Sequence, residues 1–276
     1  ACLSPGEMKS TYGTGAFMVR TFGDTPPEPG PGVLGTVAWR LGGAATYAVE
    51  GSVFNAGTVD FTGNTISDIG TNASLTADGV AYGAALLMRG VNTLNVADNT
   101  FTNVHMAVAT EKNGYSAPTQ TTFTGNTFTN TGYAFFMPSD ALTGGNVVFG
   151  AGNAIVSGAD TVQHIVWRGG SVLDLTGVTF DGQLGSEMSV ADLLALEDLI
   201  THGTDVAGAG LAVVNAGNVY VTQNSGSIQR GINAANAGFT VNIGDGTYNE
   251  NVLISTAGVT LRSVNQYGAI VDAGGT

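Results

Sequence analysis

The sequence has little of several residue types, and each shortage excludes a class of protein. Its 276 residues include 8 Lys and Arg against 21 Asp and Glu, which gives a formal net charge of −13. A chain so poor in basic groups does not suit phosphate neutralisation, so we expect no nucleic-acid partner. The single cysteine, Cys2, cannot form an internal disulfide. No apolar run reaches the roughly 18 residues that a membrane helix needs, so we expect no membrane insertion.

Side chains that commonly carry catalysis or bind metals are also few. The lysines are Lys9 and Lys112, and the three histidines are His105, His164 and His202. These histidines lack the spacing of metal ligands, and the chain has no Asp-Asp pair. We therefore expect no catalytic residue, no metal site and no cofactor.

What the chain does contain is glycine, 42 residues of it, and a short repeated pattern. The clearest copy is 121–132, with Gly-Asn-Thr-Phe at its centre. The asparagine of this pattern recurs after 35, 27 and 27 residues, and a worn copy without it follows 25 residues later. The recurring residues are Asn64, Asn99, Asn126 and Asn153, with Val178 in the worn copy. Periods of this length indicate stacked supersecondary units.

Within each unit, apolar and polar residues alternate on either side of the asparagine, and this period of two indicates strands rather than helix. About 25 residues per unit without a helical segment fit three short strands and three turns. The sequence therefore predicts a mainly β protein, a parallel β-helix. An asparagine tolerates left-handed backbone angles at a corner, and its amide can bind the equivalent asparagine of the next unit. We expect Asn64, Asn99, Asn126 and Asn153 to form a structural ladder.

A second recurring strand ends in charged or polar residues and suggests a ligand-binding edge. If the units stack in register, charged and aromatic side chains fall along one side, which suits an extended polysaccharide. The residues of this predicted glycan edge are Arg89, Glu111, Lys112, Tyr115, Phe136, Asp140, Trp167 and Arg168. The same alignment also fits a salt-bridged solvent edge, which is the simpler interpretation because repeats align whether or not anything binds. A degenerate polysaccharide lyase or hydrolase using Glu111 or Asp140 is a further alternative.

Residues 1–56 carry different motifs. They include Ser-Pro-Gly at 4–6, Lys-Ser-Thr-Tyr-Gly-Thr-Gly at 9–15, Trp-Arg-Leu-Gly-Gly at 39–43 and Tyr-Ala-Val-Glu-Gly at 47–51. This segment resembles the glycerol kinases of the sugar-kinase superfamily, which have an actin-like ATPase fold. The resemblance implies that Gly13, Thr14 and Gly15 lie against the nucleotide phosphates and that Ala56-Gly57 lies beside the nucleotide. Glycines allow close backbone approach, and a threonine hydroxyl can donate to phosphate.

The resemblance covers about a fifth of the chain and ends after Gly57, where the β repeat begins. A kinase needs nucleotide, metal and acceptor positioned together, and this segment supplies neither the base nor the acceptor site. It predicts an inactive remnant. The sequence leaves open whether the segment is a structural leader, a gene fusion or an assembly artefact.

The periodicity changes after the repeat. Ser189 to Asp192 forms a capping box, and apolar spacing predicts a helix over 190–202 in which His202 closes the last turn. A second short helix is expected over 228–237, followed by strands. This last part resembles the cap and opening coils of pectate-lyase-like right-handed β-helices, which are common in arrays of bacterial surface adhesins.

We therefore expect four parts: a kinase-like α/β-type fragment at 1–56, a right-handed parallel β-helix at 57–186, a helix and hairpin linker at 187–226, and the start of a second β-helix at 227–276. The expected function is a non-catalytic, structural or adhesive module of a larger extracellular or cell-surface protein, monomeric as a fragment. Its expected partners are an extracellular polysaccharide or neighbouring repeats. The alternatives are the degenerate polysaccharide enzyme and the inactive kinase remnant.

Overall fold

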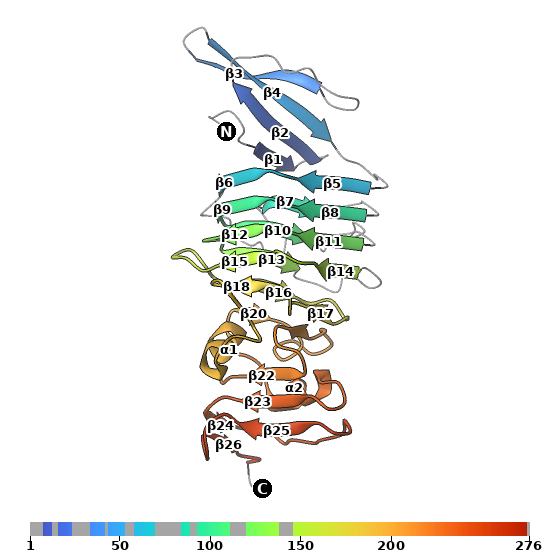
Figure 1. Ribbon diagram of the computed structural model, residues 1–276, viewed down its shortest axis with the longest axis vertical. Helices are drawn as coiled ribbons and strands as arrows, with labels where there is room; N and C mark the ends of the chain where they lie inside the picture. The colour runs from blue at the N-terminus through green and yellow to red at the C-terminus, as the bar shows by residue number, and fades with distance from the viewer. Residues whose placement is uncertain are drawn as a thin grey trace.

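The computed structural model describes residues 8–12, 16–23, 34–41, 44–52, 58–69, 84–88, 93–110, 120–137 and 146–274. Within these residues the chain is mainly β, with two short helices and several parallel sheets. The sheets follow one another along one long axis, from the N-terminal strands at one end to the C-terminal strands at the other (Figure 1).

The N-terminal strands form an antiparallel sheet in the order β1-β2-β4-β3. Its strands are β1 (Met8–Tyr12), β2 (Ala16–Gly23), β3 (Leu34–Leu41) and β4 (Ala44–Ser52). β3 and β4 pair from Leu34 opposite Glu50 to Leu41 opposite Ala44, with a shift in register after Val37. The alternating stretch at 34–41 is thus one strand of a hairpin.

The repeat forms three sheets of parallel strands, and each of its first four units contributes one strand to each sheet. The first sheet contains β5 (Thr58–Thr62), β8 (Thr93–Ala97), β11 (Gln120–Thr124) and β14 (Asn146–Phe149). The second contains β6 (Thr65–Ile69), β9 (Thr100–Val104), β12 (Thr127–Thr129), β15 (Ala154–Val156) and β18 (Thr179–Phe180), with β19 (Gln183–Leu184) added antiparallel at its end. The third contains β7 (Ala84–Met88), β10 (Met106–Thr110), β13 (Tyr133–Met137), β16 (Ile165–Trp167) and β20 (Ile200–Thr201).

Equivalent side chains of successive units stack in the core because the strands pair in register. Phe101 and Phe128 lie opposite one another on β9 and β12, with ring centroids 5.1 Å apart. Phe123 and Phe149 repeat the arrangement on β11 and β14 at 4.5 Å. Such large rings contribute both buried area and specific stacking to the stability of the core.

The C-terminal part continues with smaller parallel sheets. β17 (Leu173–Asp174) pairs with β21 (Ala212–Val213). A three-stranded sheet contains β22 (Asn218–Val221), β23 (Thr240–Ile243) and β25 (Thr260–Ser263). The last pair is β24 (Gly246–Tyr248) with β26 (Ala269–Val271). A separate apolar core, with Ile228 and Ile232 at its centre, packs in this part.

Both helices begin at a serine cap. α1 (Val190–Glu197) starts at Ser189, whose side chain accepts from the Asp192 N–H, and α2 (Ile228–Ala234) starts at Ser227 in the same way. The Glu250 carboxylate also accepts from the first two backbone N–H groups of α2 at 2.8 and 2.9 Å. These caps satisfy donors that a helix start otherwise leaves free.

Two helix lengths predicted from the sequence are wrong. The helix expected over 190–202 ends at Glu197, because Ile200 and Thr201 pair as β20 with β16. The helix expected over 228–237 ends at Ala234, and Ala235 has extended backbone angles. The right-handed β-helix stays a prediction.

In the described part of the chain, no helix is long and apolar enough to cross a membrane.

Candidate functional site

The described part of the predicted glycan edge does not present aromatic faces. Trp167 is 0% exposed and Phe136 is 6% exposed, and the Trp167 indole N–H donates to the Ser171 carbonyl at 2.8 Å. Arg168 is exposed. Ring stacking on a saccharide needs an open face, so neither ring can take that role. The remaining residues of the predicted edge lie outside the described residues: Arg89, Glu111, Lys112, Tyr115 and Asp140.

The predicted phosphate turn, Gly13, Thr14 and Gly15, also lies outside the described residues. The strands on either side of it are described. β1 and β2 pair antiparallel until Tyr12 lies opposite Ala16. The turn sequence therefore joins two paired strands.

The four repeat asparagines lie in one line and hydrogen-bond in sequence. The side-chain nitrogen of Asn64 donates to Oδ1 of Asn99 at 2.9 Å, Asn99 donates to Asn126 at 2.9 Å, and Asn126 donates to Asn153 at 3.0 Å. Each acceptor oxygen also receives the backbone N–H of the preceding asparagine. All members but Asn64 are buried, so these bonds satisfy polar groups that water cannot reach.

A second line of polar side chains, which the sequence analysis missed, lies four residues after each repeat asparagine. Asn103 donates to Asp68 at 3.0 Å, and Asn130 donates to Asn103 at 2.8 Å. All three have positive φ, between 49° and 56°, at the far corner of the second sheet. Ser157 takes the equivalent position in the next unit. Asn130 donates to Asp160 there, and the Ser157 hydroxyl donates to Asp181. In the sequence, a polar residue does recur four positions after each repeat asparagine, but its type changes from unit to unit.

A catalytic triad is suggested by the residue types of Ser157, His164 and Asp181, but their hydrogen bonds are arranged differently: the serine, rather than the histidine, contacts the aspartate. The Ser157 hydroxyl donates to Asp181 at 2.8 Å, and Nε2 of His164 lies 3.2 Å from the same hydroxyl oxygen. With its proton directed to Asp181, the serine can only accept from His164, so we assign the proton of His164 to Nε2. A general base needs a lone pair at that nitrogen. Burial lowers the pKa of His164, against the charge of Asp181, so the ring stays neutral. The three side chains therefore form an internal hydrogen-bonded group, in which Nδ1 of His164 is buried and has no partner among the described residues.

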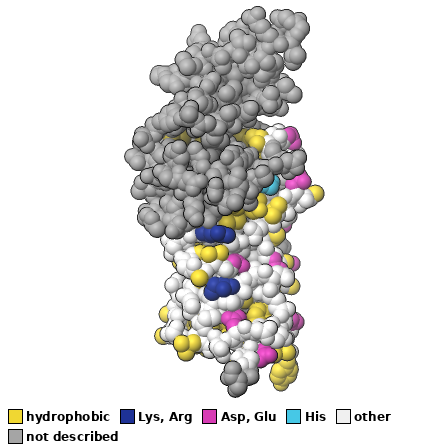
Figure 2. Space-filling model, turned by 180° about the vertical axis from the view of Figure 1, so that it is seen from behind, with side chains coloured by type: hydrophobic (Ala, Val, Ile, Leu, Met, Phe, Trp, Pro, Cys, Tyr) yellow, Lys and Arg dark blue, Asp and Glu magenta, His cyan; other side chains and the backbone are white. Residues whose placement is uncertain are grey.

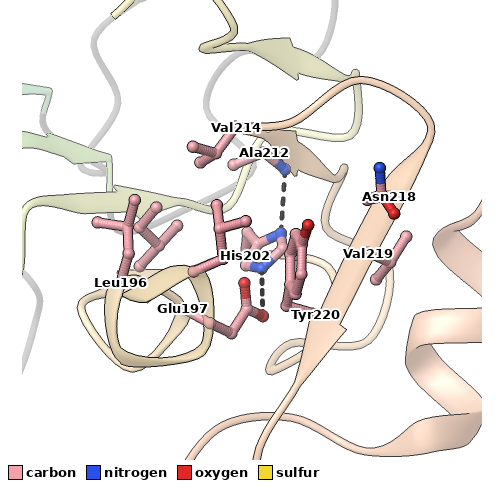
Figure 3. Close-up of a pocket in the computed structure, with 10 residues that line it drawn as sticks. Leu196, Glu197, His202, Ala212, Val214, Asn218, Val219 and Tyr220 are labelled. Carbon is pink, nitrogen blue, oxygen red and sulfur yellow. Dashed lines mark hydrogen bonds and ion pairs between the residues drawn. The ribbon is translucent and has the colours of Figure 1, made fainter. Parts of the chain in front are cut away.

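A buried polar cluster surrounds His202 (Figure 3). Nε2 of His202 lies 2.8 Å from Oε1 of Glu197, and the Thr204 hydroxyl donates to the same oxygen at 2.9 Å. On the other side of the ring, Nδ1 accepts the Ala212 N–H at 3.0 Å. His202 therefore links α1 to β21, and it does not close the last turn of a helix, as the sequence had suggested. Tyr220 lines the same small cavity.

The residues of this cluster do not fit a metal ion. Ligand atoms of Glu197, His202 and Asp205 lie within 4.8 Å of one another. A metal takes the lone pair of a neutral imidazole nitrogen. The Nδ1 lone pair already accepts from Ala212, so Nε2 carries the proton that faces Glu197. Binding at Nε2 would move that proton to Nδ1, where it would face the Ala212 N–H.

Two opposing effects act on the protonation of His202. Burial lowers the pKa of His202, while the Glu197 and Asp205 carboxylates raise it by more. A second proton would have to displace the Ala212 N–H from Nδ1.

On the face shown in Figure 2, acidic side chains are scattered rather than gathered in one patch. Neither the buried His202 cluster nor these scattered acidic side chains provide an open site for chemistry.

Curated relatives match the chain over a short stretch. A glycerol kinase of Ectopseudomonas mendocina (strain ymp) is 58% identical over 57 residues, which is 21% of this chain and 12% of that protein. A glycerol kinase of Myxococcus xanthus (strain DK1622) is 58% identical over 59 residues, 21% of this chain and 12% of that protein. A glycerol kinase of Bradyrhizobium sp. (strain BTAi1 / ATCC BAA-1182) is 54% identical over 57 residues, which is 21% of this chain and 11% of that protein. The chain thus spans about 12% of the length of these relatives.

No protein-family model matches the chain. No solved structure matches it either. The resemblance of the C-terminal part to pectate-lyase-like β-helices therefore has no support from either comparison, whereas the resemblance to glycerol kinases is shown over about a fifth of the chain.

These relatives correct the interpretation of the chain as a non-catalytic adhesive module. That interpretation was drawn from the repeat and from resemblance to adhesin arrays, and it is wrong: the relatives found are glycerol kinases, more than half identical over 57 residues. The extracellular and adhesin assignments, and the glycan contact that belonged to them, are without support.

Proposed function

We propose that the chain carries a segment derived from a glycerol kinase, at residues 1–57, which contacts nucleotide phosphates but does not transfer them. The observation that carries the proposal is the 58% identity to a glycerol kinase over 57 residues. The motifs that resemble this family all lie before residue 58, and the length of that segment equals the length of the match.

The chemistry of the turn supports phosphate contact. Gly13 and Gly15 leave room for the backbone to approach a phosphate, and the Thr14 hydroxyl can donate to a phosphate oxygen. The paired strands β1 and β2 flank this turn. Such a turn presents backbone N–H groups without needing basic side chains, which suits a chain with only 8 Lys and Arg.

Phosphoryl transfer requires more than this turn. Catalysis comes from positioning nucleotide, metal ion and acceptor together, and each must be held to within a fraction of an ångström. The matched stretch is 12% of the relative's length. In the described residues, both ring nitrogens of His202 and Nε2 of His164 are committed to internal hydrogen bonds. We therefore expect no phosphorylation of glycerol.

Calorimetric titration of the whole chain with ADP tests the proposal. We expect weak binding that Thr14→Ala abolishes, because the hydroxyl donor is lost. Thr247→Ala, at an exposed threonine of β24, is the matched control and should bind as the parent does. Absence of ADP binding by the parent, or equal binding by Thr14→Ala, would refute the phosphate contact. Turnover of ATP and glycerol would refute the inactive segment.

A further inference from the structure

The outward face of the second sheet carries a regular set of hydroxyl side chains, here called the hydroxyl strip. It lies on β6, β9 and β12, and two residues of each strand contribute. Its members are Thr65, Ser67, Thr100, Thr102, Thr127 and Thr129. The strand pairing places Thr65, Thr100 and Thr127 in one row and Ser67, Thr102 and Thr129 in the next. All six are exposed or half-exposed.

The spacing of this strip follows from strand geometry. Neighbouring strands lie about 4.8 Å apart, and residues two positions apart along a strand are separated by about 6.6 Å. The hydroxyls therefore form a nearly rectangular grid of two rows. Hydroxyl residues also occur at outward positions of the neighbouring first sheet, whose strands β5, β8 and β11 continue the same layers in Figure 1. They are Thr58, Thr62, Thr93, Thr122 and Thr124.

The grid is held rigid from three sides. Below it, Ile66, Phe101 and Phe128 are buried in the core. On one flank runs the ladder of repeat asparagines, and on the other runs the line from Asp68 through Asn103 to Asn130. A β-branched threonine has few χ1 rotamers, so little side-chain entropy is lost when such a surface binds a partner.

The charge of the strip limits what it can bind. None of its six side chains is ionisable, although the chain has a net charge of −13. A neutral face whose six side chains line no cavity identified among the described residues is a poor site for a small molecule, which needs a concave pocket to bury most of its surface. A solid with its own regular array of hydrogen-bonding groups can contact all six hydroxyls at once.

We propose that the hydroxyl strip binds the surface of ice. An ice surface is neutral, and it presents water oxygens in a regular array, as the strip presents its hydroxyls in regular rows. Each hydroxyl can donate to and accept from lattice water, while the threonine methyl groups fill the gaps between rows. Because the side chains of the rigid grid lose little entropy on contact, many weak contacts together can give measurable binding. A crystal that contacts the strip grows only between adsorbed molecules.

The test is the gap between freezing and melting temperatures of a solution of the whole chain, observed on a single ice crystal. The parent should hold the crystal without growth over a measurable interval and change its shape. Thr102→Tyr places a bulky ring at the centre of the grid and should abolish the gap. Thr260→Tyr, at an exposed position of β25 outside the strip, is the matched control and should keep it.

Circular dichroism and the unfolding midpoint check that each variant is folded; if Thr102→Tyr unfolds, Thr127→Lys replaces it, since Thr127 is also at the strip surface. Three results would overturn the proposal: no gap with the parent, an unchanged gap with the folded strip variant, or equal loss with Thr260→Tyr. Adsorption of the parent to another hydroxylated solid, such as crystalline cellulose, without any effect on ice would overturn it in favour of a different occupant.

Discussion

Replacement of Asn126 by alanine tests how much the asparagine ladder contributes to stability. Oδ1 of Asn126 accepts two bonds from Asn99, from the side-chain nitrogen at 2.9 Å and from the backbone N–H at 3.1 Å. Its own side-chain nitrogen donates to Asn153 at 3.0 Å and to the Val96 carbonyl at 2.8 Å. Asn126 is 0% exposed, so water cannot replace these partners.

The expected magnitude follows from the groups left without partners. Asn126→Ala leaves the Asn99 backbone N–H and one hydrogen of the Asn99 side-chain amide unsatisfied in the core, while the other amide hydrogen keeps the Phe61 carbonyl. Each buried unsatisfied group costs about 1–3 kcal/mol. Asn153 keeps one donor, the backbone N–H of residue 126. We therefore expect a loss of about 2–5 kcal/mol in the free energy of unfolding. Asn64→Ala, at the half-exposed end of the ladder, should cost about 1 kcal/mol because water can reach the freed groups.

Urea denaturation followed by circular dichroism measures both variants against the parent. The midpoint should fall much further for Asn126→Ala than for Asn64→Ala, with similar slopes if the transition stays cooperative. Equal, small shifts for the two variants would contradict the reasoning, because they would mean that the buried ladder contributes no more than its exposed end.

Three further predictions use the same denaturation assay. Gly226→Ala should cost more than the roughly 1–2 kcal/mol of left-handed strain, because a Cβ there would lie 2.9 Å from the Thr204 carbonyl oxygen; Gly63→Ala, with φ +67° but open space around it, should cost the strain alone, and equal losses would contradict the contact. Thr121→Val should stabilise by about 1 kcal/mol, since the buried hydroxyl has no partner among the described residues; a loss would show that the hydroxyl is satisfied. The pKa of His164 is lowered in the folded state, so its contribution to the free energy of unfolding should be lost as pH falls below about 6.5. His164→Gln should make the decline of stability with falling pH less steep, and an unchanged dependence on pH would refute this.

The repeat could be predicted from sequence because its marker keeps both identity and spacing. Asn99, Asn126 and Asn153 recur at 27 residues, and a side chain of one type bonds to its copy in the next unit. The second line of polar groups has the same spacing but varies from Asp68 to Asn103 to Ser157. Its members share hydrogen-bonding capacity rather than identity, so a pattern of letters does not reveal it.

The predicted aromatic edge failed for a different reason. Alternation between two faces assumes that one face of a strand meets water. In the third sheet both faces are covered: all five residues of Tyr133–Met137 are buried, and so are all three of Ile165–Trp167. The continuous apolar run of these strands was the available signal, and it placed Phe136 and Trp167 in the interior.

The end of α1 was misplaced because the apolar spacing continued through Ile200. Ile200 belongs to β20, which pairs with Ile165 of the preceding unit. Pairing with a residue 35 positions away cannot be read from the local spacing. The same misassignment hid the role of His202, whose ring links Glu197 to the Ala212 backbone.

The most direct test of the central claim is a calorimetric titration of the intact chain with ADP, run with and without glycerol. The account predicts weak ADP binding that glycerol leaves unchanged and that Thr14→Ala removes, since the matched segment is 12% of a glycerol kinase and lacks an acceptor site. No heat of ADP binding, or binding that tightens with glycerol, would contradict it.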